Sequence, residues 1–398
     1  MLGVSEQAGR RLVLVALVVL SLNLRTAAVS VGPVLEEVTD GLGMSHTLAG
    51  VLTSLPVLSF AGFGALAPTL ARRLGIHRTT VAALIGVIAG LAARAAVGDQ
   101  YLFLLLSLLA LGGMATANVL LPSLVKLHFP DRVGTVTALY TTALAIGLTS
   151  ALLLTVPIAE AGGGWRTGLA VWAIPAGIAL VPWLGLIAHD RRLGSAGRAI
   201  GLGAVARTPL GLAMALFFGF QSAAAYSMFG WFPQRWRDAG FSATAAGALV
   251  GLVAGVSIPL SLWIPRAAAR RTDQRGVLLA ISVCSPVGFV GLMVAPHSLA
   301  VLWAVLVGIG ACTFPLVLSL LSLRTRTSQG TAALSGWTQS AGYLLAALGP
   351  FAVGAIYDAT GGWTASLSLL LVLWAPQTAL GLYVSRPGYL EDQLAARA

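Results

Sequence analysis

Charged residues are scarce in this sequence. Only 9% of its 398 residues are charged and 57% are apolar, whereas a soluble globular protein carries about 25% charged residues. A soluble protein covers much of its surface with polar atoms, and so few charged side chains cannot supply that surface. The mean hydropathy of +0.89 leads to the same conclusion. The composition therefore excludes a water-soluble fold and predicts a chain that faces lipid over most of its surface.

Cysteine is almost absent as well. Cys284 and Cys312 lie inside apolar stretches, without C-x-x-C spacing and without a neighbouring histidine or carboxylate. We expect both to be buried structural thiols. Neither a metal site nor a cofactor is expected.

Long apolar segments recur along the whole chain, separated by short polar gaps. A helix needs about 20 mostly apolar residues to cross about 30 Å of hydrocarbon. Twelve segments of this kind are predicted as membrane spans, at residues 12–35, 48–70, 80–97, 102–125, 134–159, 165–187, 209–232, 245–264, 277–295, 299–323, 332–357 and 363–384.

The basic residues lie between these segments. They give a net charge of +11, but they are scattered rather than gathered on one polar domain, so nucleic acid is not an expected partner. Most of the 24 bases fall in the termini and in alternate gaps, and the opposite gaps hold only Arg166, Arg235 and Arg237. Positive residues favour the cytoplasmic side. We therefore predict a multi-pass protein of the plasma membrane, of the bacterial inner-membrane type, with both termini in the cytoplasm.

The chain is predicted to consist of two similar halves. Residues 1–188 would form an N-terminal six-helix bundle, 189–208 a polar cytoplasmic linker, and 209–398 a C-terminal six-helix bundle with a short tail. A shift of 196 residues overlays several segments, for example Gly112 on Gly308 and Ser123 on Ser319. The predicted fold class is an all-α membrane protein with twelve transmembrane helices in two pseudo-symmetric halves, a layout typical of transporters with parallel repeats.

Arg25 is the strongest candidate for a binding residue. It lies within the first span beside Asn23, and no segment offers it an acidic partner at depth. An ionisable residue in hydrocarbon is costly and points to function, and a guanidinium suits anionic or planar polar ligands. Arg25 would bind the solute in a central cavity, with packing against backbone carbonyls as the alternative. Arg94 lies about one turn from Asp99, so snorkelling or a salt bridge is expected there.

Other polar residues inside the spans form a second group of candidates. The 196-residue shift places Arg25 on Gln221, which makes Gln221 a natural second ligand. Further candidate substrate-binding residues are Asn118, Tyr140, Tyr226 and Gln339. For each of them a helix-to-helix hydrogen bond is the competing interpretation.

Acids and histidines are missing from the centres of the spans. All 13 acids map to gaps, tails or span ends, and none of the five histidines lies at mid-membrane. An intramembrane protease or lipid transferase would need paired acids, a Ser/His pair or a metal cluster at depth. The chain is therefore not expected to be an enzyme. A central acidic proton relay is disfavoured too, which leaves Glu36 or Glu37 at the outer end of the first span, the solute's own proton, or exchange for a counter-anion as the means of coupling.

Three motifs carry a resemblance to a known family. Residues 22–35 read LNLRTAAVSVGPVL, residues 118–126 read NVLLPSLVK, and residues 70–78 read LARRLGIHR. Together with twelve spans and a basic central loop, they resemble the major facilitator superfamily over essentially the whole chain, and within it the cyanate and 2-nitroimidazole transporter branch. The third motif is similar to the gating loop of that superfamily and keeps Arg73, Gly75 and Arg78, but Arg72 stands where an acid is usual.

The resemblance implies a secondary transporter that works by alternating access in the lipid bilayer. Its substrate would be a small anion or a small polar planar solute, and we expect a monomer. Two alternatives stay open, namely a drug or metabolite exporter of broader specificity, and a membrane receptor of the same fold that transports nothing.

Overall fold

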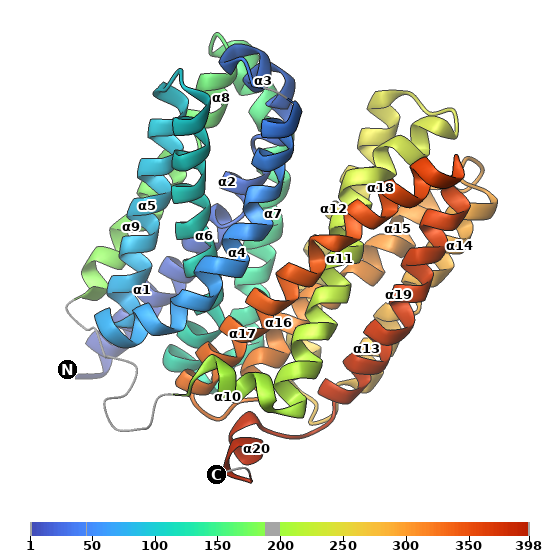
Figure 1. The fold of residues 1–398 in the computed structure, drawn as a ribbon. Coiled ribbons are helices and arrows are strands. Elements are labelled where there is room, and N and C mark those ends of the chain that lie inside the picture. The colour runs from blue at the N-terminus through green and yellow to red at the C-terminus, as the bar shows by residue number, and fades with distance from the viewer. Residues whose placement is uncertain (1, 45, 188–199, 397–398) are drawn as a thin grey trace. The chain divides into compact units, whose positions relative to one another are not determined.

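The protein is almost entirely helical in the computed structural model, which describes residues 2–44, 46–187 and 200–396 (Figure 1). Among these residues, 12 helical stretches are long and apolar enough to cross a membrane, as predicted. They are Gly9–Val34, Ser54–Leu74, Ile76–Ala96, Gln100–His128, Pro130–Ala161, Trp165–Leu186, Pro209–Asp238, Ala245–Ala269, Arg275–Val294, Ala300–Leu323, Ser328–Tyr357 and Trp363–Val384. No described residue belongs to a β-strand.

The helices divide into two compact units. The first unit takes its described residues from Met1–Asp131, Leu139–Ile200 and Thr327–Gly336, and the second from Arg132–Ala138, Gly201–Arg326 and Trp337–Ala398. Most of the predicted linker, up to residue 199, lies outside the described residues. Its described remainder contains a short helix, α10 (Leu202–Arg207). The division of the chain at residues 189–208 stays a prediction.

The first unit holds the N-terminal helices. They are α1 (Leu2–Asn23), α2 (Thr26–Val29), the 3-10 helix η1 (Gly32–Val34), α3 (Leu35–Leu42), α4 (His46–Leu74), α5 (Ile76–Ala96), α6 (Gln100–His128), the 3-10 helix η2 (Pro130–Arg132), α7 (Val133–Ala161), α8 (Trp165–Ala170) and α9 (Ala173–Leu186), apart from the end of η2 and the start of α7 (Arg132–Ala138), which belong to the second unit. Within this unit α5 packs against α6 and α9, and α6 also packs against α1 and α2.

The second unit holds the C-terminal helices. They are α10, α11 (Pro209–Asp238), α12 (Ala243–Ala269), α13 (Arg275–Ser282), α14 (Cys284–Val294), α15 (Ala300–Ala311), α16 (Thr313–Leu323), α17 (Ser328–Ala346), α18 (Leu348–Thr360), α19 (Trp363–Val384) and α20 (Leu390–Ala395), apart from the start of α17, which belongs to the first unit. Thr208 caps the start of α11, where its hydroxyl accepts a hydrogen bond from the Gly211 amide at 3.0 Å and Pro209 takes the first helical position.

Several membrane spans are interrupted, and most of the interruptions precede a proline by three residues. Proline removes the helical hydrogen bond to the carbonyl four residues earlier, and its ring clashes with that carbonyl. The interruptions of this kind lie at Trp172, Val283, Cys312 and Ala347, which precede Pro175, Pro286, Pro315 and Pro350, and at Ser30, which precedes Pro33. Other prolines, such as Pro122 of α6 and Pro233 of α11, lie inside helices that continue past them, so a proline permits an interruption without specifying one.

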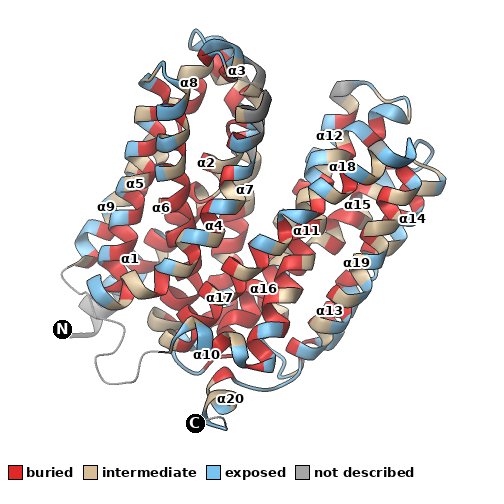
Figure 2. Ribbon diagram, viewed as in Figure 1, coloured by how far each residue is buried: buried red, intermediate tan, exposed pale blue. Residues whose placement is uncertain are grey.

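The exposed side chains of the spans are strongly apolar. Val294 is 79% exposed, Phe351 76% and Val181 66%. Exposed positions follow the outer faces of helices such as α5 and α9, while buried positions concentrate along their inner faces (Figure 2). Large side chains of this kind avoid water, and a hydrocarbon environment removes that penalty. The pattern is that of a multi-pass membrane protein.

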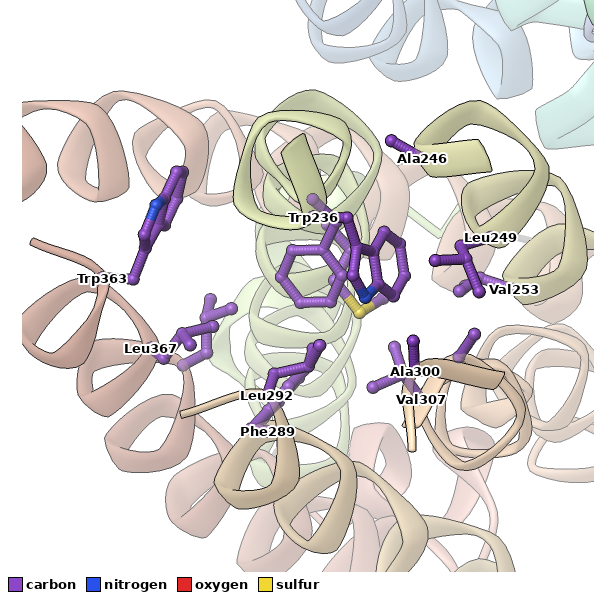
Figure 3. Packing of buried hydrophobic residues seen from close by; sticks show 14 of the residues in the cluster. Trp236, Ala246, Leu249, Val253, Phe289, Leu292, Ala300, Val307, Trp363 and Leu367 are labelled. Atoms are coloured by element: carbon purple, nitrogen blue, oxygen red, sulfur yellow. The ribbon is translucent and has the colours of Figure 1, made fainter. Parts of the chain in front are cut away.

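Aromatic side chains form the core at one end of the second unit. Trp236 is fully buried, and Phe232 packs edge-on against it with ring centroids 5.7 Å apart. Phe289 packs edge-on against Phe232 from α14 at 6.2 Å. Leu249 and Val253 of α12 border the same cluster (Figure 3). This core holds α11, α12 and α14 together.

Candidate functional site

The first membrane span is interrupted at its most polar point. The sequence predicts one continuous helix over residues 12–35, but α1 ends at Asn23, and α2 begins at Thr26. Leu24 and Arg25 form the turn between them, and Arg25 adopts φ −116° and ψ −19°. Neither a proline nor a glycine lies within the six residues that follow Asn23. The local sequence therefore does not account for the interruption, and contacts from other helices must hold it.

Two contacts hold the end of α1. The Asn23 side-chain amide is buried and donates to the Val19 carbonyl at 2.8 Å and to the Pro175 carbonyl of α9 at 3.2 Å. On α7, Gly147 meets the backbone so closely that an added Cβ would lie 1.9 Å from the Leu22 carbonyl oxygen. A glycine is needed at this crossing. The amide nitrogen of Asn23 is thus engaged in packing.

A third contact comes from Arg94 of α5, and it corrects the expectation of snorkelling or a salt bridge with Asp99. The Arg94 side chain is 0% exposed, and its guanidinium donates to the Ala27 carbonyl at 3.3 Å and to the Ser30 hydroxyl at 3.1 Å. Asp99 instead caps α6, where its carboxylate accepts from the Leu102 amide at 2.8 Å. The expectation was wrong because the Arg94 side chain is buried inside the unit and does not extend toward the end of α5.

Arg25 itself follows the end of α1 and precedes α2. Its side chain is half-buried. The Thr26 hydroxyl donates to the Asn23 carbonyl at 2.9 Å, and this hydrogen bond spans the turn that carries Arg25. A guanidinium in this position could bind a carboxylate-like or planar polar group.

Two more candidates lie in the first unit. Asn118 of α6 is 2% exposed, and Tyr140 of α7 is 1% exposed. Helix α6 packs against both α1 and α2, so Asn118 belongs to a helix that borders the interruption. Both residues therefore sit inside the unit at positions where either a solute contact or a helix-to-helix bond is chemically available.

The remaining candidates lie in the second unit. Gln221 is 3% exposed on α11, and its side-chain oxygen accepts from the Ser222 hydroxyl at 3.2 Å. Tyr226, also on α11, is half-buried with its ring centroid 6.2 Å from that of Tyr343 on α17. Gln339 of α17 is fully buried. Helix α11 runs unbroken past Gln221, unlike the first span at Arg25.

A small cavity inside the second unit, lined by both polar and apolar residues, adds residues that sequence reasoning missed. Gln221 lines it together with Ser285 and Thr313, and Trp374 and Gln377 contribute from α19. Gln377 is 5% exposed. The signal that selects Gln221, an amide inside a predicted span, applies equally to Gln377.

The predicted gating loop is shorter than expected. The sequence suggests a loop over residues 70–78, but α4 continues to Leu74 and α5 begins at Ile76, so Gly75 alone separates them. Gly75 adopts φ +99°, a conformation that side chains disfavour, and its carbonyl accepts from the Thr79 hydroxyl at 2.7 Å. Arg73 and Arg78 flank it with exposed side chains.

Another buried arginine joins helix ends in the second unit. Arg324 is 4% exposed, and it donates to the Val384 carbonyl at 2.7 Å, to the Ser385 carbonyl at 2.8 Å and to the Gln274 side chain. Burial lowers the pKa of Arg324 below its ordinary value. Like Arg94, it binds the carbonyls that a terminating helix leaves without helical partners.

Comparisons with known proteins agree with this architecture. The model of the Major Facilitator Superfamily matches residues 13–350. The 2-nitroimidazole transporter of Escherichia coli K12 is 34% identical, over 94% of this chain and 96% of its own length. The cyanate transport protein CynX of the same organism is 30% identical, over 87% of this chain and 90% of its own length.

The fold has a counterpart among solved structures. The proton:xylose symporter XylE superposes with a TM-score of 0.78 at 14% identity, over 98% of this chain and 99% of that protein. At this identity the likeness concerns the fold. The chain belongs to the Major Facilitator Superfamily of membrane transporters, in the branch that includes the 2-nitroimidazole transporter and the cyanate transport protein.

Proposed function

We propose that this protein is a secondary transporter that moves a small anion or a small polar planar solute by alternating access, with Arg25 as its principal ligand. It would work in the plasma membrane with both termini in the cytoplasm. The motion would be coupled to protons or to a counter-anion. The 70–78 motif, with Arg73, Gly75 and Arg78, would take part in gating.

The observation that carries the proposal is the position of Arg25 on an interruption of a membrane helix. Transporters bind solutes where membrane helices are broken, because the broken backbone and nearby polar groups can face the solute. The interruption at Leu24 and Arg25 has no local cause in proline or glycine, yet Asn23, Arg94 and Gly147 all support it. Contacts from α9, α5 and α7 therefore support the turn that carries Arg25.

The printed names of two relatives support the class of solute. One relative is a 2-nitroimidazole transporter and the other is a cyanate transport protein. Cyanate is a small linear anion, and a 2-nitroimidazole is a small planar ring with a nitro group. The two oxygens of the nitro group suit the planar fork of a guanidinium, which can bind them with two parallel hydrogen bonds, and the negative charge of cyanate suits its positive charge.

The other predicted ligands belong to the same proposal. In the first unit these are Asn118 and Tyr140, with Asn23 contributing through its amide oxygen. In the second unit they are Gln221, Tyr226 and Gln339. Each is a neutral polar group that could orient a solute, and none can replace the charge of Arg25.

Uptake of labelled cyanate and of a labelled 2-nitroimidazole into proteoliposomes tests the proposal. The unmodified protein is compared with Arg25→Gln and Arg25→Lys, with and without an imposed proton gradient. We expect Arg25→Gln to raise the KM for cyanate about tenfold or more, because a charge-assisted hydrogen-bond pair is lost. Arg25→Lys should lie between the two, because it keeps the charge and loses the fork.

Arg166→Gln is the matched control. Arg166 is also an arginine of the first unit, but it donates to the Ala95 and Val97 carbonyls at the end of α5. Absence of flux for both solutes in a well-folded preparation would rule out the proposed class of solute. Equal KM values in Arg25→Gln and the unmodified protein would assign Arg25 to packing.

A further inference from the structure

Arg94 is the most deeply buried charged group described in the first unit. Its side chain is 0% exposed, although a guanidinium carries five N–H donors and a permanent charge. Burial of such a group is expensive even after the protein relaxes around it. The described residues show two acceptors for it, the Ala27 carbonyl and the Ser30 hydroxyl, and no acceptor for its Nε. Simple packing would be served better by an apolar side chain.

Both acceptors belong to the segment that follows Arg25. Ala27 lies in α2, which has only four residues, and Ser30 lies just after it. The carbonyl of Ala27 is near the end of α2, where the helix supplies no further backbone donor. So short a helix has little stability of its own. The direction of this segment is therefore set by what it contacts, and Arg94 contacts it at two points.

We propose that Arg94 is a positioning residue for the solute site, because its two bonds to Ala27 and Ser30 hold the α2 segment and thereby fix the direction of Arg25. This inference rests on the proposed function of Arg25 as a ligand. Arg94 is fully buried and donates to Ala27 and Ser30. It would therefore act through Arg25 and would not contact the solute itself.

The fork of the guanidinium is essential to this role. Its Nη1 and Nη2 reach a backbone carbonyl and a side-chain hydroxyl three residues apart. A lysine keeps the charge but has one nitrogen at the end of a flexible stem, so it cannot reproduce both bonds in one geometry. Arg94→Lys therefore keeps the positive charge but loses the two-point contact with the α2 segment. Ser30→Ala removes one of the two bonds and leaves Arg94 in place.

Transport kinetics in proteoliposomes provide the test, with labelled cyanate as the solute. We expect Arg94→Lys to raise the KM about tenfold, while the Vmax per folded protein stays within about twofold. Ser30→Ala should raise the KM about threefold. The double variant should be no worse than Arg94→Lys alone, because both changes remove the same interaction. Arg166→Lys, which changes a guanidinium bound to other carbonyls, should leave the KM unchanged.

A second measurement does not depend on the choice of solute. In a background with Cys284→Ser and Cys312→Ser, Arg25→Cys places a thiol at position 25, and its rate of modification by a small hydrophilic thiol reagent reports how that side chain is presented. We expect Arg94→Gln to change this rate about fivefold or more, because Arg94 contacts the segment beside position 25. Arg166→Gln should leave the rate unchanged, because Arg166 donates to the Ala95 and Val97 carbonyls instead.

The outcomes separate the two proposals. The positioning role would be overturned if folded Arg94→Lys and Arg94→Gln both had KM values within twofold of the unmodified protein. It would also be overturned if the effects of Arg94→Lys and Ser30→Ala on the KM were additive. If the unmodified protein transports neither solute, the proposed function fails, and the modification rates alone decide the role of Arg94. Equal rates with and without Arg94 would then overturn it, and a changed rate would support it.

Discussion

The first membrane span and helix α11 occupy corresponding places under the 196-residue shift, but they differ in continuity. The segment Arg25-Thr26-Ala27-Ala28 overlays Gln221-Ser222-Ala223-Ala224. The first is a turn followed by a four-residue helix, and the second lies within a helix that runs unbroken from Pro209 to Asp238 (Figure 1). Two segments of similar composition therefore adopt different backbones, and neither contains a proline or glycine that explains the difference.

The residues around each segment explain the difference. Position 94 corresponds to Val290 under the same shift, and position 147 corresponds to Tyr343. Val290 is 47% exposed and has no donor to offer a carbonyl. Tyr343 is too large for the close backbone crossing that Gly147 allows at Leu22. At these two positions the second unit has neither a buried arginine nor a glycine, and a buried neutral Gln221 corresponds to Arg25.

Proline substitutions at Ala28 and Ala224 should show the largest difference in stability between the two segments. Ala224→Pro removes a hydrogen bond inside α11 and introduces a clash, which costs about 3 kcal/mol or more. Ala28 is the third residue of α2 and lies three residues after Arg25, the spacing that the other interruptions show. Ala28→Pro removes the bond from the Ala28 amide to the Arg25 carbonyl at 3.2 Å, but it lies in the first turn of a helix, so it should cost about 1 kcal/mol, less than Ala224→Pro.

Thermal unfolding in detergent measures both variants against the unmodified protein. A large loss in Ala28→Pro would mean that the α2 segment behaves as part of a continuous helix. Comparable small losses in both variants would mean that α11 is weakly held at Ala224.

Gly147→Ala should have the next largest effect. The added methyl group would lie 1.9 Å from the Leu22 carbonyl oxygen and 2.7 Å from its carbonyl carbon, so the backbone of α1 or α7 has to move. Overpacking of this kind costs about 1–3 kcal/mol. We expect a lower midpoint of thermal unfolding together with a raised KM, because the displaced end of α1 carries the turn of Arg25.

Gly177→Ala in α9 is the control for Gly147→Ala. No atom lies within 4 Å of the position its Cβ would take, and alanine favours helix over glycine, so its stability should stay the same or rise. A Gly147→Ala variant as stable as Gly177→Ala would show that the crossing at Leu22 is looser than the contact indicates.

Much of the fold could be predicted from the sequence, because its determinants are local. The twelve spans follow from runs of apolar residues, and their number and places are confirmed within the part of the chain that the structure describes. A proline follows each of the interruptions before Pro175 and Pro315, but the sequence does not distinguish these prolines from Pro122 or Pro182, where the helix continues. Cys312 is buried as expected, whereas Cys284 is only half-buried, because hydropathy does not tell which side of a span faces the protein.

The candidate site could be predicted only in part. Arg25 stands out as a charge within an apolar run, but the interruption that carries it depends on Gly147 and Arg94, which are distant in the sequence. Proximity to Asp99 made Arg94 look like a surface residue, whereas Asp99 is used as a helix cap. Burial of a charge is decided by the packing of three helices, which no single segment encodes.

Thr26→Val should have the smallest effect on stability, and it tests the hydrogen bond across the turn of Arg25. The buried Thr26 hydroxyl donates to the Asn23 carbonyl at 2.9 Å, across the turn where α1 has ended. Loss of this bond should lower the free energy of unfolding by about 1 kcal/mol.

Thr116→Val is the matched control in the continuous helix α6, where the hydroxyl donates to the Gly112 carbonyl at 2.8 Å. That carbonyl keeps its helical amide partner, so Thr116→Val should cost about 0.5 kcal/mol or less. Unfolding in detergent compares the two, and equal losses would show that the Asn23 carbonyl is as well satisfied as one inside a helix, so that the hydroxyl contributes nothing particular to the turn of Arg25.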